Sequence, residues 1–537
     1  MPAPLHVPTH TRAAGILLHI TSLPSPWGIG DLGPEAEKFL DFLKEAGQCC
    51  WQFLPLGPTL EIHGHSPYMS TSTFAGNPLL LSPDYLLRDG WIEPRELDDN
   101  PEFYQYLVRF HEVAAFKEQL LKKAFAHFLT AKAQEKDFAA FCDNSPWLAD
   151  YALFVALGEK FGGLPWHEWP PAVARREPAA LATITQELAD RIQYHKFVQF
   201  LFAGQWREFK KKAEARKIRL IGDIPIYVAL NSADVWADQA CFQLDPTTLE
   251  PEYVAGVPPD YFSPTGQAWG NPLYRWNREK ELPQKLPQKP KGDLEKLTEK
   301  SKGELNETVM LWWRLRLKRL AELVDVVRID HFRAFESYWR IPAGAETAEK
   351  GEWVKGPGAA FFQQLGQVME NLNIIAEDLG TITPPVAALR ESLGFAGMKV
   401  LQFAFDGDPE NLYLPWNYTS PNCVVYTGTH DNETTLGWYL NAAVDNLCKE
   451  RARRAANSDG HAIHLDFIKL AYASIAALAI IPLQDALGFG NDCRMNSPGS
   501  NHDNWAWRCA PRFLTKELAE MLYREVTFYN RLSIEGK

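Results

Sequence analysis

Three acidic residues each come at or just after the end of an apolar, β-branched run. Asp330 ends Val326-Val-Arg-Ile-Asp330, Glu377 follows Asn373-Ile-Ile-Ala, and Asp431 comes after Tyr426-Thr-Gly-Thr-His. Retaining cleavage of a glycosidic bond needs one ionised carboxylate as nucleophile and one protonated carboxyl as acid. A lone strand-end carboxylate more often caps a helix or pairs with a basic side chain. Three on one face of a barrel favour glycoside chemistry.

Neighbouring residues suit the protonation states that this chemistry requires. Arg328 lies two residues before Asp330, so both side chains point to the same face of a strand, and the cation favours an ionised Asp330. The apolar run before Glu377 favours the protonated form of that carboxyl. His430, next to Asp431, either donates a hydrogen bond to a sugar hydroxyl or is bonded to the backbone.

The elements that must position these residues are eight short apolar runs, separated by helical stretches such as Pro34 to Gly47. Such runs are typical of buried parallel strands. We therefore predict an α/β fold, a (β/α)8 TIM barrel, in which active-site residues gather at the carboxyl ends of the strands. The predicted strands are Gly15 to Ile20, Cys50 to Leu56, Arg219 to Pro225, Val324 to Asp330, Asn373 to Asp378, Met398 to Phe403, Cys423 to Thr429 and Ala479 to Gln484.

Two intervals between predicted strands are too long for simple crossover connections. We interpret residues 1–537 as one catalytic barrel domain with two inserted subdomains. The interval after the second predicted strand contains helix-like stretches at Phe110 to Leu129 and Ala180 to Phe209, and we assign 80–205 as a helical subdomain. The second subdomain, 236–318, is loop-rich. Within the second, Glu281 to Gly303 has almost no apolar residues and is predicted to be a solvated excursion.

Bulk properties restrict the partners. The 537 residues carry a net charge of -12 without long acidic runs, which argues against nucleic acid or an anionic membrane as a partner. The eight cysteines show no C-x-x-C spacing, so neither a zinc site nor a disulfide framework is expected. With no secretory signal at the N-terminus and no apolar run long enough to span a bilayer, we predict a cytoplasmic protein, a monomer or a weak homo-oligomer.

Motifs along nearly the whole chain resemble the 4-α-glucanotransferases called amylomaltases or disproportionating enzymes, glycoside hydrolase family 77 of the α-amylase clan. Besides the three carboxylate segments, the resemblance is carried by Gly15 to Gly33, Ser66-Pro-Tyr68, Phe74 to Pro78, Gly256 to Phe262, Gly270 to Trp276, Met495 to Gly499 and Asn504 to Arg508. The resemblance departs at His63-Gly-His65, where the family usually has Gly-Asp before Ser-Pro-Tyr. The Lys-rich excursion looks like an extra insertion.

The resemblance implies roles that spacing alone could not assign. Asp330 is expected to be the nucleophile, Glu377 the acid/base and Asp431 the stabiliser of the transition state. The expected donor is an α-1,4-glucan and the expected acceptor glucose or a maltooligosaccharide, with no cofactor and no metal. The residues expected to bind substrate are Ser66, Tyr68, Asp223, Tyr261, Phe262, Trp269, Arg328 and His430.

Three other functions are compatible with parts of this sequence. Gly28-Ile-Gly30-Asp-Leu-Gly33 matches the dinucleotide fingerprint, but the seven residues Thr21 to Trp27 separate it from the preceding run, whereas an NAD-binding turn follows its strand closely. An amylase-like hydrolase would use water as acceptor in the same barrel. A glucan-binding scaffold without turnover would not need the carboxylate trio.

Overall fold

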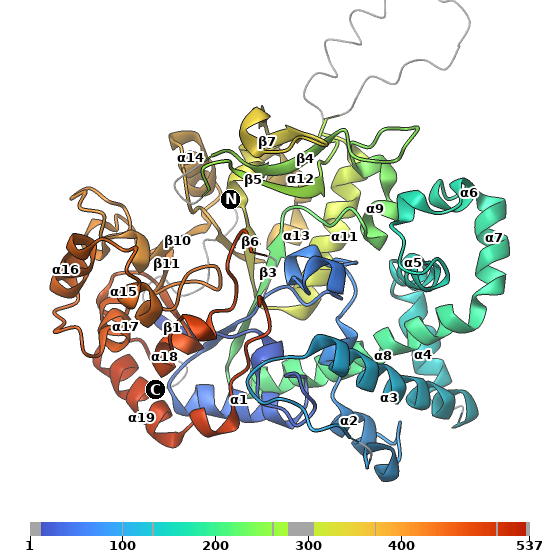
Figure 1. Ribbon diagram of the computed structural model, residues 1–537, viewed down its shortest axis with the longest axis horizontal. Helices are drawn as coiled ribbons and strands as arrows, with labels where there is room; N and C mark the ends of the chain where they lie inside the picture. Colours follow the sequence, from blue (N-terminus) through green and yellow to red (C-terminus); the bar gives the residue numbers. More distant parts are fainter. Residues whose placement is uncertain are drawn as a thin grey trace, which may run out of the picture.

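The computed structural model describes residues 12–98, 100–131, 134–259, 263–277, 305–370, 372–500 and 503–532. Eight parallel strands close into a barrel in the order β1-β12-β11-β10-β9-β6-β3-β2, at the centre of the molecule (Figure 1). This confirms the predicted (β/α)8 fold. The strands are β1 (Ala13–Leu17), β2 (Cys50–Gln52), β3 (Arg219–Pro225), β6 (Val326–Asp330), β9 (Asn373–Ala376), β10 (Ala396–Val400), β11 (Cys423–Tyr426) and β12 (Leu478–Pro482).

The strands form where both faces are buried, as every residue of β1 and β12 illustrates. Most of the predicted runs extend past the carboxyl end of the observed strand. Ile20–Ser22 and Leu401–Phe403 form 3-10 turns, and Leu483–Leu487 is the short helix α18. An apolar run marks buried residues, and residues at the barrel mouth stay buried after the hydrogen bonds between strands have ended. The predicted strands are therefore longer than the observed ones.

Helices surround the barrel. Helix α1 begins with Pro34 at its first position, and the left-handed Gly47 lies just beyond its end, as the sequence predicts. The helices are α1 (Pro34–Glu45), α2 (Pro83–Arg88), α3 (Phe110–Ala131), α4 (Glu135–Asp143), α5 (Leu148–Lys160), α6 (Pro171–Ala174), α7 (Pro178–Glu187), α8 (Ala189–Ala215), α9 (Ala233–Ala237), α11 (Glu307–Leu323), α12 (Gly358–Leu365), α13 (Gln367–Glu370), α14 (Pro384–Ser392), α15 (Thr435–Leu440), α16 (Asn446–Ala455), α17 (Ile463–Ala473), α18 (Leu483–Leu487) and α19 (Lys516–Phe528).

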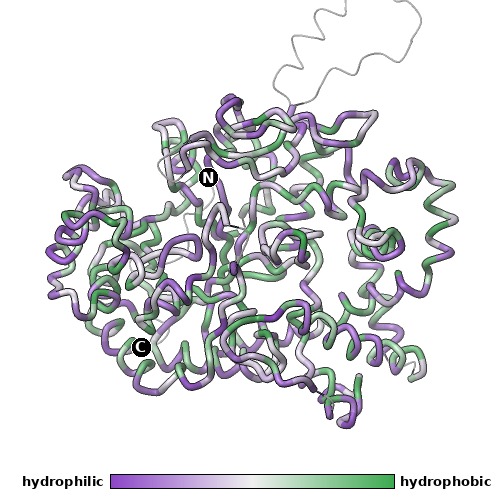
Figure 2. The backbone as a smooth tube through the Cα atoms, viewed as in Figure 1, coloured by the Kyte–Doolittle hydropathy of each residue, from purple (hydrophilic) through white to green (hydrophobic). Residues whose placement is uncertain are grey.

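Helices α2 to α8 connect β2 to β3 and occupy the right side of Figure 1. Apolar and polar stretches alternate along these helices (Figure 2), as expected where one face packs on a core. The predicted stretch Ala180 to Phe209 divides at Leu188 into α7 and α8. That the insertions 80–205 and 236–318 fold as separate subdomains stays a prediction.

A second, four-stranded antiparallel sheet covers the upper part of the molecule in Figure 1, in the order β5-β4-β7-β8. Sequence analysis missed it because its strands are short and half-exposed, and because β4 and β7 pair from distant parts of the chain. The predicted excursion Glu281 to Gly303 lies outside the described residues. The strands are β4 (Tyr253–Val257), β5 (Gln267–Pro272), β7 (Ser337–Pro342) and β8 (Glu352–Lys355).

The glycines of the dinucleotide-like motif serve packing. A Cβ at Gly30 would lie 1.9 Å from the Ile20 carbonyl oxygen, and one at Gly33 would lie 2.2 Å from Ser82 Oγ. Gly28 adopts a positive φ of 79° and approaches the ring of Phe103. Packing therefore accounts for these glycines, and the strands close into a barrel instead of the open sheet of a dinucleotide-binding fold, so the NAD-binding alternative is wrong.

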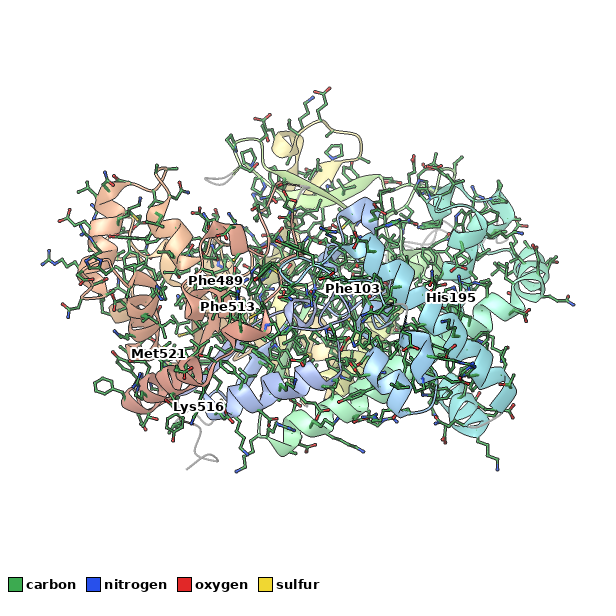
Figure 3. All side chains as sticks on the ribbon, turned by 60° about the horizontal axis from the view of Figure 1, so that its bottom comes forward. Phe103, His195, Phe489, Phe513, Lys516 and Met521 are labelled. Carbon is green, nitrogen blue, oxygen red and sulfur yellow. The ribbon has the colours of Figure 1, made fainter. Side chains whose placement is uncertain are left out.

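The C-terminal segment closes the barrel on the side opposite the helical insertion. In Figure 3 Phe489 lies beside Phe513, with ring centroids 4.9 Å apart, and α19 carries Lys516 and Met521. Helix α19 packs on α1 and α17, so the two ends of the barrel domain meet. Among the residues that the structure describes, no helix combines the length and apolarity needed to cross a membrane.

Candidate active site

Asp330 and Glu377 lie side by side at the carboxyl ends of neighbouring strands. Strands β6 and β9 pair in parallel with Ile329 opposite Ala376, and the two acidic residues come next in this register. Neighbouring strands lie about 4.8 Å apart. Adjacent positions on neighbouring strands suit a nucleophile and an acid/base that act on one glycosidic bond with retention.

Arg328 joins Asp330 to Asp223 of β3. Its Nη1 lies 3.0 Å from Asp330 Oδ1 and donates to Asp223 Oδ2 at 2.5 Å. The side chains of Arg328 and Asp223 are 3% and 0% exposed, whereas that of Asp330 is 27% exposed. The carboxylate of Asp330 is therefore open to a ligand, while Arg328 and Asp223 behind it are sealed from water.

Tyr68 and His430 continue this chain of contacts to the third carboxylate. The Tyr68 hydroxyl donates to Asp223 Oδ2 at 2.8 Å and lies 2.8 Å from His430 Nε2. Because the hydroxyl has one hydrogen and gives it to Asp223, Nε2 must carry the hydrogen between the ring and Tyr68. His430 Nε2 also lies 3.2 Å from Asp431 Oδ2. The sequence-predicted strand-end histidine thus contacts side chains of the site.

Asp431 is anchored from the opposite side by the segment after β12. Asn496 Nδ2 donates to Asp431 Oδ1 at 2.6 Å, and Arg494 Nη2 donates to the Asp431 carbonyl oxygen at 2.6 Å. Burial alone would raise the pKa of Asp431, but the charge and hydrogen bond of His430 and the bond from Asn496 outweigh it and lower the pKa. Asp431 is therefore ionised throughout the neutral range, and its side chain is 43% exposed.

The other two carboxyls have raised pKa values for a shared reason. Burial, and then the negative charge of Asp330, raise the pKa of Glu377 to about 8. Burial raises the pKa of Asp330 to about 6, although the charge of Arg328 opposes the shift. Near neutral pH this leaves Asp330 ionised and Glu377 protonated, the division between nucleophile and acid that retaining cleavage needs.

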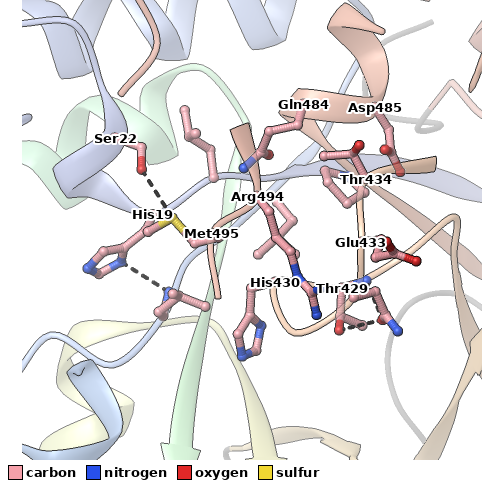
Figure 4. A pocket seen from close by; sticks show the side chains of 15 residues that line it. His19, Ser22, Thr429, His430, Glu433, Thr434, Gln484, Asp485, Arg494 and Met495 are labelled. Carbon is pink, nitrogen blue, oxygen red and sulfur yellow. Dashed lines mark hydrogen bonds between the residues drawn. The ribbon is translucent and has the colours of Figure 1, made fainter. Parts of the chain in front are cut away.

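Two cavities flank these contacts. One, shown in Figure 4, lies behind His430, and its wall includes His19 and Arg494. Burial, and then the charge of His430, lower the pKa of His19 to about 3, so this ring is neutral and its Nδ1 accepts from the Leu54 amide. The wall of the other cavity includes Tyr68 and Asp223. Asp330 and Glu377 line neither of these two cavities.

Of the remaining predicted substrate-binding residues, two lie next to residues of the site and two lie outside the described residues. Ser66 caps the turn Pro67–Met69, and its Oγ accepts from the Tyr68 amide at 3.3 Å, so it orients Tyr68. Trp269 lies on β5 and meets the ring of His331 edge-on, 4.9 Å between centroids, next to Asp330. Tyr261 and Phe262 lie outside the described residues. The segment that carries these residues, Gly256 to Trp269, begins and ends in paired strands.

Several residues of the site were not predicted individually. Asn496 and Trp505 lie in the segments Met495 to Gly499 and Asn504 to Arg508, which carried family resemblance without any assigned role. Trp505 packs against both rings of the Tyr68–His430 pair, at 5.8 and 6.1 Å. The available signal was the motif itself, because an asparagine and a tryptophan in a loop carry no spacing pattern.

Known proteins resemble this chain over nearly its full length. A sequence profile described as 4-alpha-glucanotransferase, glycoside hydrolase family 77, matches residues 18–282 and 301–515. The chain is 48% identical to a 4-alpha-glucanotransferase of Synechocystis sp. (97% of this chain, 98% of the relative) and 47% identical to one of Thermus thermophilus (94% and 96%).

A solved structure agrees with these sequence relatives. The amylomaltase of Streptococcus agalactiae in complex with acarbose is 36% identical to this chain. It superposes with a TM-score of 0.87, over 97% of this chain and 99% of that one. The described barrel, the paired carboxylates and these matches over nearly the full length lead to one conclusion: the chain belongs to the 4-alpha-glucanotransferase family, glycoside hydrolase family 77.

Proposed function

We propose that this enzyme transfers a segment of an α-1,4-glucan to the 4-hydroxyl of glucose or another maltooligosaccharide, with retention. The single observation that carries the mechanism is the register that sets Asp330 beside Glu377 in opposite protonation states. The donor class follows from the family and from the acarbose complex of the Streptococcus agalactiae relative.

In the first step Asp330 attacks the anomeric carbon while Glu377 protonates the departing glycosidic oxygen. Arg328 keeps the nucleophile ionised and fixes its orientation through the contact at 3.0 Å. The product is a covalent glycosyl-enzyme of inverted anomeric configuration, and the released part of the glucan leaves with the proton from Glu377.

In the second step the ionised Glu377 removes the proton from the 4-hydroxyl of the acceptor, which attacks the anomeric carbon and displaces Asp330. Two inversions restore the α configuration. Asp431, ionised and partly exposed, stabilises the positive charge that develops on the sugar ring in both transition states. His430 and Asn496 hold this anion in place, and His430 is proposed to donate to a sugar hydroxyl when the ring is bound.

Incubation with pure maltotriose tests the proposal. Disproportionation yields glucose together with maltooligosaccharides longer than the substrate, whereas hydrolysis yields shorter sugars alone. Separating the products by chromatography at early time points distinguishes the two, and Asp330→Asn is the matched control for a contaminating activity. Glucose and maltose without any longer product would show that water is the acceptor and would overturn the transferase assignment.

We further propose a cytoplasmic location. All eight cysteines are free thiols, although Cys49 and Cys50 have sulfur atoms 3.8 Å apart, which suits a reducing compartment. The prediction of a monomer or a weak homo-oligomer is open to sedimentation equilibrium.

A further inference from the structure

Glu377 is held by main-chain amides from two different loops. The amide of His331, directly after the nucleophile, donates to Glu377 Oε2 at 2.8 Å, and the amide of Leu379 donates to Oε1 at 2.9 Å. The first of these bonds crosses from the loop after β6 to the loop after β9. It therefore couples the orientation of the acid/base to the backbone that carries Asp330.

His331 has an unusual backbone for a residue with a side chain. Its φ of 52° and ψ of 47° lie in the left-handed region, which residues with a side chain uncommonly enter, although Asn, Asp and His do so more often than the others. The conformation is supported on both sides. The ring packs edge-on against Trp269 of β5, and the next residue, Phe332, donates its amide to the Glu377 carbonyl oxygen at 3.1 Å.

The side chain of His331 is uncharged in this position. Burial, and then the positive charge of Arg333, lower the pKa of His331 to about 3. Its ring therefore brings no charge to Glu377 at neutral pH. Arg333 donates to the Thr381 carbonyl oxygen at 2.6 Å, a third bond between the loops after β6 and β9.

We propose that His331 is a positioning residue for the acid/base: its left-handed backbone aims the amide at Glu377 and so orients the carboxyl toward the leaving oxygen. The inference rests on the proposed function of Glu377. It assigns to the main chain of His331 a part in the reaction that does not depend on contact with the sugar.

The bond to His331 changes the titration of Glu377 in a known direction. An amide that donates to a carboxylate favours the ionised form, so losing it raises the pKa of Glu377. The other groups that act on Glu377 are Asp330 and Arg328 of β6, and Tyr413 from the segment after β10 is also close enough to interact. The substitutions below leave these three residues unchanged.

Two substitutions at this position separate backbone from side chain. Asparagine tolerates the left-handed region and valine does not, while both remove the ring and its contact with Trp269. We expect His331→Asn to keep the basic limb of the kcat/KM profile on maltotriose near that of the parent enzyme. In His331→Val the limb moves upward by about one pH unit and kcat/KM at neutral pH falls about tenfold.

Asn457→Val is the matched control for backbone strain. Asn457 has a φ of 48° and is exposed just after α16, away from the site. The substitution Asn457→Val should lower the melting temperature without moving the pH profile of kcat/KM. Both substitutions of His331 remove the ring that packs on Trp269, so any change in KM caused by that contact should be equal in His331→Asn and His331→Val.

The outcomes are distinct. If the parent enzyme transfers but His331→Val keeps the parent pH profile, the inference about His331 is wrong while the proposed function stands. If His331→Asn shifts the limb as far as His331→Val, the ring rather than the backbone is responsible, which also overturns it. If the parent fails to disproportionate maltotriose, the proposed function itself fails. Should His331→Val not fold, His331→Ala replaces it. A basic limb that shifts in His331→Ala but not in His331→Asn supports the inference, and an unshifted limb in both overturns it.

Discussion

Asp330 and Glu377 occupy equivalent positions on two hydrogen-bonded strands, one residue beyond the pair Ile329 and Ala376. The proximity of the two carboxyls is therefore fixed by strand register, and a loop rearrangement is not required to bring them together. Proximity also produces their electrostatics, because burial and the charge of Asp330 together raise the pKa of Glu377. Predictions about pH, charge and neighbours follow from this pair.

The pH dependence of kcat/KM on maltotriose should be bell-shaped. Asp330 must be ionised and its pKa is about 6, so activity falls as the pH drops through that value. Glu377 must be protonated and its pKa is about 8, so activity falls as the pH rises through that value. Because the two groups interact, the apparent pKa values read from the two limbs of the profile describe the pair of carboxyls and not either residue alone. Initial rates measured across the range check this, and activity that keeps rising well above pH 8 would contradict Glu377 as the acid.

Asp330→Asn should lower transfer on the order of a thousandfold or more, because the shape is kept and the attacking charge is lost. Asp378→Asn is the matched control. Asp378 accepts from the Met398 amide at 2.7 Å and lies 3.0 Å from Arg390 Nε, so it serves structure next to the site. We expect Asp378→Asn to lower the melting temperature with a much smaller effect on kcat. Full activity in a folded Asp330→Asn protein would refute the nucleophile assignment.

Arg328→Gln should move the acidic limb of the pH profile to higher pH. Burial raises the pKa of Asp330 and the charge of Arg328 limits that rise, so removing the charge raises the pKa further. The nucleophile is then protonated over more of the neutral range and the rate at neutral pH falls. Arg328→Lys keeps a charge without the planar fork and should give an intermediate shift. An unmoved acidic limb in Arg328→Gln would show that Arg328 does not set the ionisation of Asp330.

Asn496→Ala should lower kcat about tenfold, since a hydrogen bond to a charged group contributes about 1.5 kcal/mol or more. The lost donor lies 2.6 Å from Asp431 Oδ1. The pKa of Asp431 rises on this loss but starts far below neutrality, so no new limb should appear near pH 7. Asn504→Ala alters the same segment, where its side chain accepts from the Ser497 amide, and should have a smaller effect on kcat. Equal losses in both variants would indicate a general effect of the segment.

Arg531→Met should destabilise the barrel by about 3 kcal/mol or more, because several buried carbonyl groups lose their donors. Arg531 is fully buried at the amino end of the barrel and its guanidinium donates to carbonyl oxygens of Ala13, Ala471, Tyr472, Ser474 and Ala476. Arg524→Met, an exposed position of α19, is the control. Urea unfolding of the two variants measures the difference, and equal midpoints would contradict a structural role for Arg531.

The sequence determined the barrel and three carboxylates at or just after the ends of its strands. Buried parallel strands need continuous apolar runs, so the eight strands were visible without homologues, and Asp330, Glu377 and Asp431 were found because each marks the end of such a run. Alternation along β6 also placed Arg328 on the face of Asp330, which the 3.0 Å contact confirms. These patterns lie within a few consecutive residues, so they can be recognised in the sequence without the structure.

The tertiary structure decided which residues meet from distant segments. Nothing in the amino-acid sequence pairs Tyr68 with Asp223, or Asn496 with Asp431. A hydrogen bond between side chains from distant segments leaves no periodic pattern in the sequence. The sheet of β4, β5, β7 and β8 was hidden for the same reason, since its half-exposed strands gain their partners through long-range pairing. The protonation states of Asp330 and Glu377 likewise depend on burial and on a neighbouring charge, which exist once the barrel has closed.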